Sequence, residues 1–98
     1  MKWFRCFIRG DNFPGQMVGE SRPVGFYVTR FIKASDGAKA ESLALTQLRA
    51  DPMLAKPERF TPSDNIRVFF EAIEEINPVD VPDVQPGFTW FPMDEENH

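Results

Sequence analysis

The stretch of sequence that decides the fold is residues 24–33, which read Val-Gly-Phe-Tyr-Val-Thr-Arg-Phe-Ile-Lys. β-Branched and aromatic residues dominate this stretch, and such a composition is typical of a β-strand. Immediately after it, Ser35 or Asp36 can cap the free amides of a helix, and residues 38–50 are mostly good helix formers. Pro52 ends that helix, because proline disfavours the helical conformation of the residue before it. The centre of the chain is therefore predicted to be a strand followed directly by a helix.

Two further segments have the composition of strands. Residues 2–9 alternate in the manner of a strand with two partly covered faces, and residues 66–76 open with β-branched and aromatic residues. The second segment would also align its apolar side chains as a helix, but its first residues favour a strand. Residues 10–23 are rich in turn formers, so we expect them to form a long loop.

The last part of the chain is rich in proline. Prolines at positions 78, 82, 86 and 92 exclude a helix from most of it, and residues 88–91 have room only for a short edge strand. We assign residues 1–76 to a single α+β domain. Residues 77–98 form a Pro-rich, acidic C-terminal extension, which in one interpretation packs on the sheet.

Together these elements predict an α+β fold, a two-layer sandwich in which one main helix lies on one face of a three- to four-stranded mixed sheet. The expected order is β-β-α-β plus a short edge strand. The first two strands are expected to be antiparallel. The strands on either side of the helix, if parallel, would be joined by a right-handed crossover.

The composition excludes several classes of protein. The chain has 98 residues, of which 42% are apolar, and this is enough for one compact domain. No apolar run approaches the roughly 18–20 residues of a membrane-spanning helix, and the N-terminal residues lack a signal-peptide core. Cys6 is the only cysteine, so we expect no disulfide framework and no thiolate metal cluster. These observations indicate a soluble, cytoplasmic protein with no membrane partner.

Charge is distributed unevenly along the chain. Residues 1–33 contain six cations and two anions, whereas residues 34–98 contain five cations and thirteen anions, and no Lys or Arg follows Arg67. The acidic stretch is interpreted either as solvated surface or as a contact with a basic surface, on a partner or on the chain's own N-terminal part. Both interpretations disfavour a nucleic-acid partner, because binding to phosphates requires a basic face.

One helix covers only one face of such a sheet. If Phe4, Cys6 and Ile8 face the helix, several large aromatic residues lie on the other face, and an apolar patch of that size is seldom bare on a monomer. The middle strand adds either residues 26, 28 and 30 or residues 27, 29 and 31 to this open face, and the sequence does not choose between them. The other two long strands are expected to contribute Trp3, Arg5, Phe7, Arg9, Arg67, Phe69, Glu71 and Ile73.

Three occupants compete for this open face. The first is another protein, most simply a second copy of the chain, held through Trp3, Phe7, Phe69 and Ile73, because twofold dimers are the commonest oligomers. The second is the C-terminal extension, folded back so that its aromatic residues at positions 88, 90 and 91 cover the face. The third is a nucleic acid with bases stacked on the aromatic residues, which the acidic composition and the lack of an RNP-type motif disfavour.

The sequence shows no arrangement typical of an enzyme. His98, the sole histidine, is the last residue, so no Ser or Cys is expected to have a fixed imidazole base. Cys6 is interpreted as a small core residue. Glu71, Glu74 and Glu75 offer too few converging oxygens for a hard cation. We therefore expect no catalytic residue, no metal and no cofactor.

A small-anion or nucleotide site is the alternative to protein association. Arg5, Arg9 and Arg30, with Tyr27 nearby in the pattern, would bind a carboxylate or phosphate if they converged. The competing interpretation is that these arginines form cross-strand ion pairs with Glu71 or Glu75. Protein association through the open face is the primary expectation.

Two stretches carry a resemblance to known proteins, FRCFIRGDNF at residues 4–13 and GFYVTRF at residues 25–31, the latter followed by a helix that contains Ala and Glu. With the Phe/Glu strand at residues 69–75, they resemble a group of small uncharacterised bacterial α+β proteins with no assigned activity. The resemblance covers roughly the first half of the chain. It implies a bacterial cytosolic origin and a compact α+β domain, and it transfers no activity, cofactor or catalytic residue.

Overall fold

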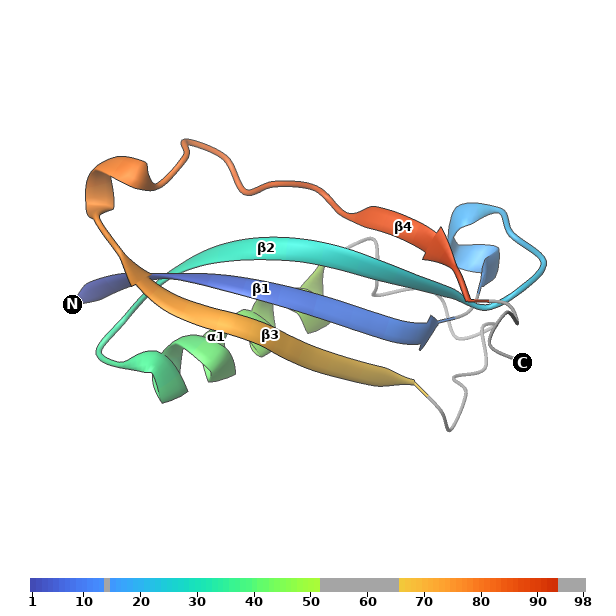
Figure 1. Cartoon of the computed structure of the whole chain (residues 1–98), viewed down its shortest axis with the longest axis horizontal. Coiled ribbons are helices and arrows are strands. Elements are labelled where there is room, and N and C mark those ends of the chain that lie inside the picture. Colours follow the sequence, from blue (N-terminus) through green and yellow to red (C-terminus); the bar gives the residue numbers. More distant parts are fainter. Residues whose placement is uncertain (14, 52–65, 94–98) are drawn as a thin grey trace.

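In the part of the chain that the structure describes, one helix lies on one face of a four-stranded sheet (Figure 1). The computed structural model describes residues 1–13, 15–51 and 66–93. An α+β fold with one main helix is thereby confirmed. The elements in chain order are β1 (Lys2–Phe13), a 3-10 turn (Gly15–Val18), β2 (Val24–Ala34), α1 (Gly37–Ala50), β3 (Arg67–Ile76), a second 3-10 turn (Pro78–Asp80) and β4 (Thr89–Pro92).

All strand pairs in the sheet are antiparallel, so the expectation of a mixed sheet is wrong. The strand order is β3-β1-β2-β4, and β1 pairs antiparallel with both of its neighbours. β2 and β3, which flank α1 in the sequence, therefore run in the same direction but do not pair with each other. The first strand of the chain, β1, lies between them and pairs antiparallel with each. The parallel pairing of β2 with β3 that a β-α-β segment suggests is therefore not formed.

The short edge strand expected near residues 88–91 is present as β4. It pairs antiparallel with the first residues of β2, from Val24↔Pro92 to Tyr27↔Thr89. The ladder is extended by a hydrogen bond of 3.0 Å from the amide of Met93 to the carbonyl oxygen of Pro23. Pro92 lies at the end of an edge strand, where a missing N–H costs least.

Helix α1 begins at a capping aspartate, and the sequence left open whether Ser35 or Asp36 would fill this role. The Asp36 side chain accepts a hydrogen bond of 2.8 Å from the amide of Lys39. The buried face of the helix carries Ala40, Ala44 and Leu48, and the small alanines let α1 approach the sheet closely. Among the described residues, no helix has the length and apolar character needed to cross a membrane.

The core lies between α1 and the sheet. Phe4, Cys6 and Ile8 of β1, which the alternation in residues 2–9 places on one side of the strand, face the helix. Phe26 of β2 is fully buried at one end of this core, and Gly10 lies directly opposite it on β1. A Cβ atom at position 10 would lie only 2.2 Å from the Phe26 ring, so glycine is required there.

A β-bulge in β3 changes which of its residues face the helix. In the pairing of β1 with β3, Phe7 lies opposite Ala72 and Ile8 lies opposite Phe70, so Glu71 is an extra residue. Beyond this point the alternation is shifted by one residue, and such a shift exchanges the two faces of a strand. Ile73 therefore aligns with Cys6 and packs against the core, and the expectation that Ile73 lies on the open face is wrong.

Candidate functional site

The candidate site is the open face of the sheet, the face opposite α1 (Figure 1). Three of its large aromatic side chains are more than one third exposed, namely Phe7 (38%), Tyr27 (36%) and Phe69 (39%). By strand alternation and register, the open face consists of Trp3, Arg5, Phe7, Arg9 and Asp11 of β1, Tyr27, Thr29, Phe31 and Lys33 of β2, Arg67, Phe69, Ala72, Glu74 and Ile76 of β3, and Thr89 and Phe91 of β4.

Three aromatic rings form a continuous row across this face, which we call the aromatic row: Phe7, Tyr27 and Phe91. The Phe7 and Tyr27 rings are stacked, with centroids 5.4 Å apart and planes 3° from parallel. Tyr27 lies 5.3 Å from Phe91, so the row runs from β1 over β2 to β4. Gly25 makes room for its last member, because a Cβ atom there would lie 2.4 Å from the Phe91 ring. The aromatic row thus presents one apolar strip to solvent.

Arg9 is the central cation of the open face. Its guanidinium carbon lies 4.7 Å from the centroid of the Phe69 ring, which is a cation–π distance. Its Nε lies 3.2 Å from Oδ1 of Asp11, and its Nη1 lies 3.4 Å from Oε2 of Glu71. The bulge at Glu71 has a chemical consequence here, because it brings a carboxylate to Arg9. The positive charge of Arg9 is therefore matched within the chain.

Arg5 is matched in the same way. Its guanidinium donates a hydrogen bond to the carboxylate of Glu74, which lies directly opposite on β3. Such exposed pairs contribute only about 0–1 kcal/mol to stability. Their larger effect is on surface charge, since a cation and an anion stand side by side at both positions. The expected cross-strand pairing is present for Arg9, which pairs with Glu71, whereas the partner of Arg5 is Glu74 and not Glu71 or Glu75.

A hollow of about 310 Å³ lies beside Phe7 on the open face. Ala72 and Thr29, the two residues directly opposite Phe7 on the neighbouring strands, are smaller than the ring that stands between them. Arg5 and Glu74 border the hollow on the side away from Tyr27. The bulge again affects the geometry, because the register of Ile8 with Phe70, continued without a bulge, would place Glu71 opposite Phe7.

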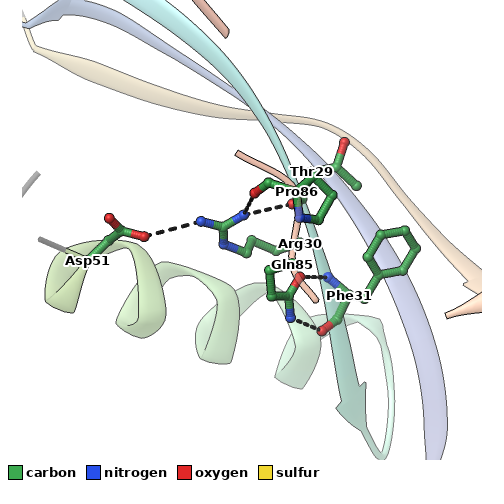
Figure 2. Close-up of polar contacts among 6 residues, drawn as sticks. All are labelled: Thr29, Arg30, Phe31, Asp51, Gln85 and Pro86. Carbon is green, nitrogen blue, oxygen red and sulfur yellow. Dashed lines mark hydrogen bonds and ion pairs between the residues drawn. The ribbon is translucent and has the colours of Figure 1, made fainter. Parts of the chain in front are cut away.

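Arg30 lies on the opposite face from the other predicted ligand-binding residues. It is only 6% exposed and is part of the helix-side layer (Figure 2). Its Nη1 donates hydrogen bonds to the carbonyl oxygens of Thr29 (3.0 Å) and Pro86 (2.6 Å), and its Nη2 donates to Oδ2 of Asp51 (3.2 Å). Its guanidinium carbon also lies 5.3 Å from the centroid of the Phe88 ring. Arg30 therefore joins β2, the end of α1 and the C-terminal segment.

The predicted site residues are consequently divided between two faces. Arg5, Arg9 and Tyr27 are on the open face, whereas Arg30 is behind it, so the described residues do not assemble a joint anion site from the three arginines. The sequence could not place Arg30, because either set of alternating residues in β2 was compatible with the open face. Of the predicted interaction residues, the structure places Trp3, Phe7 and Phe69 on the open face and Ile73 on the helix side.

The aromatic residues of the C-terminal segment are also divided. Phe88 and Trp90 pack edge-on against Phe26 on the helix side, with centroid distances of 5.1 Å and 5.4 Å. Only Phe91 reaches the open face, where it extends the aromatic row. The described part of the C-terminal segment thus lengthens the open face at its edge and leaves Phe7, Tyr27 and Phe69 exposed.

Cys6 belongs to the core and not to a reactive site. It has no exposed surface, and burial, assisted by the negative charge of Glu41, raises the pKa of its thiol to about 11. The thiol is therefore protonated at neutral pH, whereas a nucleophilic cysteine must form a thiolate. Among the described residues, no group of three or more His, Cys, Asp and Glu side chains is placed to hold a metal ion.

The resemblance drawn from residues 4–13 and 25–31 stays a prediction, because comparison with protein-family models, with curated proteins and with solved structures finds no match.

Proposed function

We propose that the protein is a protein-association domain that forms a homodimer by packing the open faces of two sheets against each other. The observation that carries this proposal is the aromatic row together with Phe69, exposed on a face that no element of the described residues covers. Apolar patches of this kind mark interaction sites, and aromatic residues dominate the energy of protein interfaces.

The charge of the open face favours a protein surface over a nucleic acid. Arg5 and Arg9 are each matched by a carboxylate of the same chain. Phosphate binding gains its free energy from unmatched cations that replace counterions, and these two arginines offer little of that kind. A face on which exposed rings alternate with arginines already paired to carboxylates is suited to a partner surface of the same composition, such as a second copy.

Both edges of the sheet are poorly suited to pairing with another chain, which leaves the face as the route to association. At one edge, β3 contains the bulge at Glu71 and the charged residues Glu74 and Glu75. At the other edge, β4 is short and ends at Pro92, and beyond it the Gln85 carboxamide exchanges two hydrogen bonds of 2.9 Å with the backbone of Phe31 (Figure 2). Bulges, charges and proline are the devices that prevent edge-to-edge pairing.

The size of the open face is sufficient for a modest dimer. Three strands of about ten residues cover roughly 34 by 14 Å, or roughly 480 Å² of flat area in each copy. Two such faces bury about 1,000 Å², near the lower limit for a specific interface. We therefore expect a dimer whose population depends on protein concentration.

The test is the solution mass of variants in which one exposed ring is replaced by a carboxylate. We expect wild-type protein to elute with twice the 11.3 kDa of one chain, and Phe7→Glu or Phe69→Glu to elute as a folded monomer, because an unpaired buried charge costs about 3–5 kcal/mol. The measurement is light scattering on a sizing column, with circular dichroism to verify the fold.

Leu43→Glu is the matched control. Leu43 is exposed to the same extent as Phe7, at 40%, but lies on α1 on the other side of the molecule. This variant should keep the mass of the wild type. A monomeric wild type, or equal masses for wild type and both aromatic variants, would contradict the proposed function.

A further inference from the structure

Phe7 borders a hollow on the open face, on the side of its ring that faces away from Tyr27. The Phe7 ring stacks on the ring of Tyr27. Tyr27 lies on β2 and pairs with Arg9, which is two residues after Phe7 on β1. The space on the other side of Phe7, toward Arg5 and Glu74, is consequently left open as the hollow of about 310 Å³. The open face thus carries an exposed phenyl ring and an unfilled hollow next to each other.

Resting on the proposed dimer, we propose that this hollow receives the Phe7 ring of a second copy of the chain, and that the twofold axis passes between Phe7 and Ala72. A twofold axis midway between a protruding ring and a hollow places each ring in the hollow of the other copy. Both contacts then form at once. Any other occupant would have to supply a ring of its own and also a hollow for Phe7.

The size of the hollow is adequate for this seating. An apolar cavity of about 150 Å³ is enough to hold a benzene molecule, so a hollow of about 310 Å³ accommodates a phenyl ring. On the β3 side of Phe7 it is lined by the short side chain of Ala72, which leaves a ring room to enter from solvent. Phe7, at 38% exposed, still has ring surface to bury.

The charges at the rim of the hollow fit a second copy as well. The rim carries one cation and one anion, Arg5 and Glu74. A twofold-related copy offers Glu74 to Arg5 and Arg5 to Glu74, so the seating brings together opposite charges in both directions. Complementary charges of this kind determine the register of an interface more than its affinity.

The test is to fill the hollow with a larger side chain at one of the residues that line it. Ala72→Phe places a ring in the hollow without changing Phe7, and it should raise the dimer dissociation constant about tenfold or more. Ala72→Ser, which keeps the hollow empty, should leave the dissociation constant within about twofold of wild type. Ala72→Leu fills the same position with a smaller side chain and serves as a second variant with the same direction of effect. Sedimentation equilibrium gives the constants, and thermal unfolding verifies that each variant is folded.

The decisive variant exchanges the ring and the hollow. In the double variant Phe7→Ala/Ala72→Phe the axis still lies midway between them, so the dimer should recover to within a few fold of wild type. A wild-type dimer that is lost in Phe7→Glu but unaffected by Ala72→Phe would overturn the seating and leave the proposed function standing. Failure of the double variant to recover would also overturn the seating, and a monomeric wild type would overturn both proposals.

Discussion

Cys6 lies on the buried face of β1 with no exposed surface, and its environment favours the neutral thiol. The pKa of the thiol is raised from 9.0 to about 11, mainly by burial and in addition by Glu41. In the unfolded chain the thiol ionises near its ordinary pKa. The native state must therefore hold a proton that the unfolded state releases between about pH 9 and pH 11.

This linkage has a direct consequence for stability. A raised folded pKa contributes stability that is complete below the unfolded pKa and is lost as pH rises through the folded pKa. We expect the free energy of unfolding to fall by roughly 2–3 kcal/mol more in wild type than in Cys6→Ala between pH 8.5 and pH 11. Urea unfolding of both proteins across this pH range measures the difference between their free energies of unfolding. The titration of all other groups is common to both proteins and cancels in this difference. Parallel pH profiles would show that Cys6 has no such linkage.

At the scale of the elements, α1 depends on one side chain at its start. The Asp36 carboxylate accepts the Lys39 amide at 2.8 Å, and its negative charge lies at the positive end of the helix dipole. Ser35, its exposed neighbour, is not the cap. The strength of the cap matters because only a narrow face of α1, centred on Ala40, Ala44 and Leu48, is buried.

We expect Asp36→Ala to lower the free energy of unfolding by about 1 kcal/mol, because it removes the cap. Ser35→Ala should change it by less than about 0.5 kcal/mol, since substitutions of exposed residues are usually that small. Chemical unfolding followed by circular dichroism measures both. Equal effects of the two substitutions would mean that the cap contributes nothing specific.

At the scale of the whole molecule, part of the uneven charge is matched inside one copy. Basic residues of β1 pair with acidic residues of β3, as Arg5 with Glu74, Arg9 with Glu71, and Lys2 with Glu75 at 3.8 Å. The contact of the acidic stretch with the chain's own N-terminal part, which the sequence allowed, is therefore present. In the proposed dimer the exposed rings therefore supply the affinity, and the charges of Arg5 and Glu74 determine the register.

If ion pairs form mainly within one chain and the rings hold the two copies together, the response of the proposed dimer to salt can be predicted. Raising the ionic strength from about 0.1 M to about 1 M shortens the Debye length from about 10 Å to about 3 Å and screens exposed charges. We expect the solution mass of the wild type to be unchanged, because burial of aromatic surface is insensitive to screening. Light scattering at the two salt concentrations measures this. A dimer that dissociates in salt would point to contacts between charges in place of the aromatic row.

Several features of this molecule were accessible from local sequence chemistry. The strand at residues 24–33, the helix after it and the inward-facing Phe4, Cys6 and Ile8 follow from propensity, capping and alternation, which act between near neighbours in the chain. The short edge strand follows from the placement of the prolines. The presence of an aromatic face opposite the helix follows from the same alternation, because one helix covers one side of a sheet.

The sequence by itself determined where the strands and the helix lie, and that β1 buries one side and exposes rings on the other. The expectation of a loop from residue 10 was wrong at its start, because β1 continues to Phe13 by pairing with β2 and β3. Only the tertiary structure decided that β1 lies between β2 and β3, that the bulge at Glu71 sends Ile73 inward and Ala72 outward, and that Arg30 is buried behind the open face. The physical reason is the distance along the chain over which each interaction acts. Periodicity and propensity reflect interactions between near neighbours in the sequence. Strand order, register and the pairing of buried charges depend on residues that are distant in the chain and meet only in the folded protein.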